Sequence, residues 1–160
     1  MKKILFLLLI ASLVLAVSSC KRTDVGDPPW DGPAGYNFLV EGSASPAVLL
    51  VDGVQHISRI TVRATDAKGT PLAGRTILFQ QADSTLLWSE IGFFENSEPT
   101  IKKTTDGNGL VTVTFYISGD YDFPGTDLQM YIRALLVVDG RIDGLSLPQD
   151  YISILLMHAN

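Results

Sequence analysis

Apolar and polar residues alternate along much of the chain after residue 45. In the clearest stretch, Ile60, Val62 and Ala64 occupy every second position, and arginine or threonine lies between them. Residues 111–117 and 128–134 repeat this alternation. Because successive side chains of a strand point to opposite faces of a sheet, each stretch predicts a strand with one buried and one exposed face.

Shorter apolar runs predict further strands, at residues 48–51, 75–80, 91–94 and 151–157. Residues that favour hairpins and tight corners separate the runs, at positions 52–53, 66–69, 106–109 and 139–140. No stretch after Cys20 keeps a helical period. About seven short strands with frequent turns predict an all-β fold, an antiparallel immunoglobulin-like β-sandwich over residues 45–160.

Two motifs in these strands and turns resemble a known family. The first is ITVRATDAKGTPLAG at residues 60–74 followed by TILF, and the second is TDGNGLVTVTF at residues 105–115. They are similar to the bacterial immunoglobulin-like domain of the invasin and intimin type (group 1), in which a strand ends in Asp, a Gly-x-Pro turn follows, and a Thr-Asp corner precedes an alternating strand. The resemblance runs from about residue 45 to residue 157. The chain departs from the family in its longer segment 82–100 and in carrying the domain once.

The resemblance implies a scaffold, because its motif residues suit corners. Glycine accepts a positive φ, proline fixes φ, and aspartate accepts hydrogen bonds from nearby backbone amides. The residues concerned are Gly69, Gly74, Gly107, Gly109, Pro71, Asp66 and Asp106. Since immunoglobulin-like sandwiches support many functions, the resemblance implies a non-catalytic structural, adhesion or protein-interaction module.

The first nineteen residues have the pattern of a secretory signal. Lys2 and Lys3 precede an apolar run that is shorter than a membrane span and ends in small residues. The next residue, Cys20, is the only cysteine of the chain. The stretch 17–20, VSSC, resembles the lipobox of bacterial lipoproteins, which implies removal of residues 1–19 and acylation of Cys20 in the lipid bilayer. A signal peptide with a chance cysteine near its end is the alternative.

Residues 20–44 are predicted to be a tether, because the stretch after Cys20 is dense in Pro, Gly and Asp and has no period. Trp30 and two further aromatic residues, Tyr36 and Phe38, either dock back on the domain or form an exposed binding stripe. Lys21 follows the cysteine, which in enteric-type sorting resembles an outer-membrane lipoprotein. The interpretation is a cell-envelope protein, at the periplasmic face or the cell surface.

Charge and side-chain chemistry narrow the function classes. A net charge of −5 without a basic cluster argues against a nucleic-acid partner. His56 and His158 are the only histidines, and neither has the neighbours of a catalytic set, so no enzyme and no cofactor are predicted. Asp106 and Asn108 partly match a calcium loop but lack its other ligands, which favours turn capping.

Segment 82–100 is where a binding function is expected, because long ordered loops often carry function. Its Trp88 and Phe94, together with Trp30 of the tether, are the candidate contacts for a protein partner or a cell-envelope glycan. Ile91 and Phe93 are predicted to face inward. For Trp88, the sequence favours neither burial in the core nor exposure at the surface. A glycan-binding accessory lipoprotein of a polysaccharide-handling system is the alternative function.

Overall fold

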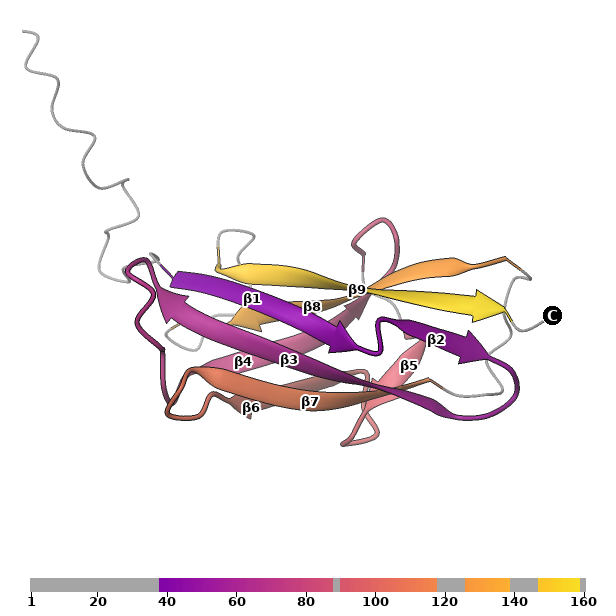
Figure 1. Cartoon of the computed structure of the whole chain (residues 1–160), viewed down its shortest axis with the longest axis horizontal. Coiled ribbons are helices and arrows are strands. Elements are labelled where there is room, and N and C mark those ends of the chain that lie inside the picture. The colour runs from indigo at the N-terminus through magenta and orange to yellow at the C-terminus, as the bar shows by residue number, and fades with distance from the viewer. Residues whose placement is uncertain (1–37, 88–89, 118–125, 139–146, 159–160) are drawn as a thin grey trace, which may run out of the picture.

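The computed structural model describes residues 38–87, 90–117, 126–138 and 147–158. Over these residues the chain forms nine strands and no helix (Figure 1), and so contains no helix that is long and apolar enough to cross a membrane. The strands are β1 (Phe38–Ser45), β2 (Val48–Val51), β3 (His56–Asp66), β4 (Thr76–Ala82), β5 (Gly92–Phe94), β6 (Thr100–Thr104), β7 (Leu110–Ile117), β8 (Leu128–Leu136) and β9 (Gln149–His158).

The strands form two sheets that pack face to face. Sheet A has the order β1-β3-β7-β5, and sheet B has the order β2-β9-β8-β4-β6. Neighbouring strands are antiparallel except for β2 and β9, which are parallel. The predicted all-β immunoglobulin-like sandwich is therefore confirmed.

Two strands lie where the sequence pattern predicts none. β6 falls inside a polar stretch, and β1 falls inside the predicted tether 20–44. Residues 38–44 therefore belong to the sandwich, and the predicted tether ends too late in the chain. The pattern hides β1 because its inward positions after Val40 are the small residues Gly42 and Ala44.

The core fills the space between the sheets with the inward side chains of the alternating strands. Phe79, Phe94 and Phe115 are completely buried there, together with isoleucine, leucine and methionine side chains from β3, β4, β7, β8 and β9. The ring of Phe94 lies between the other two, with centroid distances of 6.3 Å to Phe79 and 5.6 Å to Phe115. Tilted aromatic contacts of this kind stabilise a core beyond the area they bury.

The chain passes from sheet A to sheet B between β1 and β2. Figure 1 shows β1 leading directly into β2, which lies beside β9. The Ser45–Pro46 peptide bond is cis. Ser58 Oγ donates a hydrogen bond of 2.6 Å to the Pro46 carbonyl, and the Leu155 amide donates one of 2.9 Å to the Ala47 carbonyl. These two bonds fix the crossover against both sheets.

β1 also packs closely on β9, which requires a glycine. The Gly42 amide donates a hydrogen bond of 2.7 Å to Asp150 Oδ2. A Cβ atom at residue 42 would collide with the side chain of Ile152. Gly42 therefore lets the edge strand of sheet A approach sheet B.

The two motifs, at residues 60–74 and 105–115, form corners capped by aspartate, as predicted. Asp66 Oδ1 accepts hydrogen bonds of 2.8 Å from the amides of Lys68 and Thr70. Asp106 Oδ1 accepts the equivalent bonds, two and four residues along the chain, at 2.8 and 2.9 Å. The hydrogen bond from the Thr70 amide is the main reason that the pKa of Asp66 lies below its usual value.

The two corners also bond to each other. The Ala64 amide donates to the Gly109 carbonyl at 2.8 Å, and buried Thr105 donates from its hydroxyl to the Leu72 carbonyl at 2.6 Å. The same hydroxyl accepts the Arg75 amide at 2.9 Å. The motif residues thus bond mainly to the backbone of the chain itself, which is the behaviour of a scaffold.

Candidate functional site

The candidate contact residues of the sequence do not form a site on the described surface. Phe94 is fully buried in the core, so its prediction as a partner contact is wrong. Ile91 is buried as predicted, whereas Phe93 is partly exposed on the outside of sheet A. Trp30, Trp88 and Cys20, the predicted lipidation site, lie outside the described residues.

The path of segment 82–100 explains the burial of Phe94. The segment leaves β4 in sheet B, pairs with β7 as β5 in sheet A, and returns to pair with β4 as β6. The buried side chain of Gln81 holds it, since its Nε2 donates to the Gly92 carbonyl at 2.6 Å and its Oε1 accepts the Gly92 amide at 2.8 Å. Strand alternation from this fixed point turns Phe93 outward and Phe94 inward.

His56 forms a hydrogen bond with an aspartate at a corner. His56 Nε2 lies 2.8 Å from Asp52 Oδ1. The hydrogen bond from His56 is the largest reason that the pKa of Asp52 is lowered. Within the described ranges, no group of three or more His, Cys, Asp and Glu side chains could hold a metal ion.

The outward face of sheet A combines apolar, cationic and hydroxyl side chains in cross-strand rows. One row contains Ile57, Tyr116 and Phe93, which are neighbours in the strand register. The rings of Phe93 and Tyr116 are parallel to within 7°, with their centroids 5.3 Å apart. Ile57 is 53% exposed. This row is an apolar surface at one end of the sheet.

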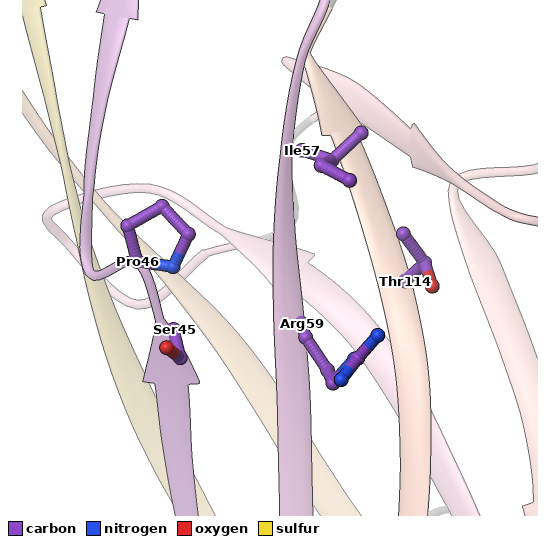
Figure 2. Close-up of a pocket in the computed structure, with 5 residues that line it drawn as sticks. All are labelled: Ser45, Pro46, Ile57, Arg59 and Thr114. Carbon is purple, nitrogen blue, oxygen red and sulfur yellow. The ribbon is translucent and has the colours of Figure 1, made fainter.

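The next row of the same face contains Ser45, Arg59 and Thr114, again as register neighbours. Ser45, Arg59, Thr114, Pro46 and Ile57 line a pocket of about 290 Å³. Figure 2 shows that Ser45 and Pro46 come from the β1 side, while Arg59 extends from β3 toward Thr114 on β7. The pocket lies at the carboxyl end of β1, beside the crossover to sheet B.

Arg59 is the charged group of this pocket, and it is exposed. Among the described residues, its side chain forms no hydrogen bond, ion pair or cation–π contact. A guanidinium is always protonated at neutral pH and presents a planar set of donors that matches a carboxylate. The pocket therefore holds a fixed positive charge whose donors are available to a ligand.

The acidic residue nearest to this row along the strand register is already bonded. Glu95 follows β5, forms an ion pair with Lys103, and accepts the Thr114 amide at Oε2 over 2.8 Å. Burial raises the pKa of Glu95. The hydrogen bonds from Lys103 and Thr114 lower it by more, so that the pKa lies below its usual value. Glu95 is thus held as a carboxylate that its own partners neutralise.

Two residues at outward strand positions are a signal for this surface that the alternation of apolar and polar residues hides. The outward positions of β3 and β7 are the polar half of the alternation, and the prediction treated them as solvent-facing. Isoleucine at 57 and tyrosine at 116 depart from that polar pattern. Strand pairing then places both beside Phe93 of the long segment, which a single sequence does not show.

Comparisons with known proteins support the fold alone. No protein-family model matches the chain, and no curated protein matches it. Among solved structures, the E. coli chaperone DraB is similar, with 10% identity and a TM-score of 0.50 over 76% of this chain and 56% of that chain. The periplasmic chaperone SfaE has 9% identity and a TM-score of 0.45 over 76% of this chain and 58% of that chain. This chain thus spans a little over half the length of both chaperones.

A PapD-like domain of human CEP192 has 6% identity and a TM-score of 0.44, over 84% of this chain and 93% of that chain. The likeness to DraB, with a TM-score of 0.50, supports a shared β-sandwich fold. At such low identity the likeness shows a common fold and no common activity.

Proposed function

We propose that this protein is a lipid-anchored cell-envelope protein whose single immunoglobulin-like domain is a non-catalytic binding module. Its contact surface is the outward face of sheet A around the pocket. The observation that carries the proposal is Arg59, an exposed cation with no partner among the described residues, in a pocket next to an exposed apolar row. A concave site that combines a few polar groups with apolar walls is typical of ligand binding.

The lining of the pocket supports binding and not catalysis. A serine or threonine hydroxyl acts as a nucleophile only when a neighbouring base activates it. Ser45 and Thr114 line the pocket with Arg59, and a guanidinium does not accept a proton. The groups present offer hydrogen bonds and charge to a ligand.

The proposal of a lipid anchor is based on the first twenty residues of the sequence. The lipobox-like stretch ending at Cys20 supports acylation, and several acyl chains bind a bilayer far more tightly than one. The motifs at residues 60–74 and 105–115 support membership of the invasin and intimin type of bacterial domain, which we retain as part of the proposal. Lys21 supports the outer membrane as the location.

Membrane fractionation tests the anchor. We expect the wild-type protein in the membrane fraction and a Cys20→Ala variant in the soluble fraction, because the variant lacks the acylated thiol. A Ser19→Thr variant, which keeps the cysteine, is the control for changes near the cleavage site. Unchanged fractionation of the Cys20 variant contradicts the lipoprotein part of the proposal.

A pull-down from cross-linked native membranes tests the contact surface. The comparison uses wild-type protein, Arg59→Gln and Arg63→Gln, since Arg63 lies on the same strand and is also exposed but does not line the pocket. We expect a specific component to be lost with Arg59→Gln and kept with Arg63→Gln. Recovery of every component by the Arg59 variant contradicts the assignment of this surface.

The alternative function, a glycan-binding accessory protein, is favoured by a separate observation. The outward face of sheet A is rich in hydroxyl groups, with Ser43, Thr61 and Thr112 forming the row next to the pocket row. Hydroxyl groups can both donate and accept hydrogen bonds, as sugar hydroxyls do.

A further inference from the structure

We propose that the pocket at the carboxyl end of β1 binds an acidic saccharide, with Arg59 holding the carboxylate of one sugar ring. The inference deepens the proposed function, on which it rests, by naming the ligand class of the same site. Three features of the described residues carry it: the charge of the pocket, the chemistry of the surrounding face, and the backbone bonding of the sheet.

The charge of the pocket selects an anion. The protein as a whole is acidic, with a net charge of −5. Even so, the guanidinium of Arg59 in this pocket forms no hydrogen bond with any described residue. Glu95 does not compensate Arg59, because it bonds to Lys103 and to the Thr114 amide. Since a guanidinium and a carboxylate form paired, charge-assisted hydrogen bonds, a carboxylate is an anion that this pocket suits.

The surrounding face selects a ligand that brings its own hydroxyl groups. Ser45 and Thr114 stand beside Arg59 in the pocket. The adjacent row offers Ser43 together with Thr61 and Thr112, whose hydroxyl oxygens lie 3.2 Å apart. On the other side, exposed Ile57 leads to the Tyr116 and Phe93 rings, which provide an apolar wall for the C–H groups of a sugar ring.

The position of Arg59 on an inner strand of sheet A favours a saccharide over a peptide. Peptides often bind sandwich domains by adding a strand to an open edge, where backbone groups are unpaired. Arg59 lies on β3, which is paired with β1 on one side and β7 on the other, so its backbone groups are already bonded. A pocket of about 290 Å³ is at the small end of ligand sites, which span roughly 300–1,000 Å³, and suits one ring.

Binding of matched saccharide pairs to the full-length protein in detergent tests the inference. The pairs are trigalacturonate and its methyl ester, sialyllactose and its methyl ester, and a hyaluronan tetrasaccharide and its carboxyl-reduced form. Each pair keeps the sugar framework and removes the charge of the carboxylate. We expect at least one acidic member to bind about ten- to a hundredfold more tightly than its neutral partner, which is the usual range for a charged hydrogen bond.

Variants then locate the binding. Arg59→Gln should weaken the binding of the acidic member about ten- to a hundredfold, whereas Arg63→Gln, with the same change of net charge, should leave it within about twofold. Arg59→Lys should lie between wild type and Arg59→Gln, because it keeps the charge and loses the planar fork. Thermal unfolding of each variant checks that the exposed substitutions leave the fold intact.

Four results overturn the inference. They are equal binding of acidic and neutral partners, no binding of any acidic saccharide, an equal loss in the Arg59→Gln and Arg63→Gln variants, and equally tight binding of an acetylated Asp-Glu peptide. If the pull-down still loses a component with Arg59→Gln while no saccharide binds, the proposed binding surface stands and the saccharide assignment falls. If the component also persists, both fail.

Discussion

The corners at residues 64–74 and 104–110 and the outward face of sheet A differ in where their polar side chains find partners. In the corners, Asp66, Thr105 and Asp106 bond to backbone groups of the chain itself. On the outward face, Arg59 has no partner among the described residues. The motif residues at 60–74 and 105–115 therefore stabilise the fold, whereas the proposed binding residues lie at ordinary strand positions.

We expect substitutions in the corners and the core to lower the free energy of unfolding, and substitutions on the outward face of sheet A to lower the affinity for a ligand. Substitutions of matched chemistry on the two sides test this division.

Phe94→Ala is expected to have the largest effect on stability. Its ring is fully buried between Phe79 and Phe115, so truncation leaves a cavity and should lower the free energy of unfolding by about 3–5 kcal/mol. The matched control is Phe93→Ala on the same strand, whose partly exposed ring should account for about 1–2 kcal/mol. Urea unfolding measures both. Equal losses would contradict the burial of Phe94 and the partial exposure of Phe93.

Thr105→Val should have the next largest effect. The substitution keeps the shape of the side chain but leaves the Leu72 carbonyl and the Arg75 amide without their bonds to the Thr105 hydroxyl. Because Thr105 is buried, we expect a loss of about 1–3 kcal/mol in the free energy of unfolding. Thr112→Val on the exposed face should change it by less than about 0.5 kcal/mol. A large loss for Thr112→Val would contradict the division between scaffold and surface.

Asp66→Ala should have a smaller effect that depends on pH. The pKa of Asp66 is lowered in the folded protein by the Thr70 amide. A lowered pKa means that the carboxylate stabilises the fold at pH values above its unfolded pKa, and that this contribution is lost as the pH falls through the folded pKa. Thermal unfolding should therefore show the variant less stable than wild type at pH 6, with a smaller difference at pH 2. An equal difference at both pH values would contradict a role for the charge.

The sequence predicted the fold well because strand alternation and corner chemistry are local signals. The inward residues of β3, β7 and β8 and the caps at Asp66 and Asp106 were all predicted from short stretches. β1 was missed because small residues replace large apolar ones where the strand approaches β9. Its position depends on a contact between residues far apart in the chain.

The candidate site could not be predicted from the sequence to the same degree. Aromatic residues in a long segment pointed to Phe94, and only the pairing of β5 with β7 shows that this ring faces the core and Phe93 the surface. Likewise, Ser45, Arg59 and Thr114 become neighbours only through the register of three strands. A single sequence contains no local signal for that register.

The direction of β1 separates the pocket from the end of the domain that lies nearer to Cys20 in the sequence. The strand begins at Phe38, the end nearer to Cys20 in the sequence, and ends at the pocket residue Ser45. At about 3.3 Å per residue, its eight residues cover roughly 23 Å between the first and the last Cα atom. In the proposed lipoprotein, the length of this strand would separate the pocket from the end of the domain that is joined to the tether.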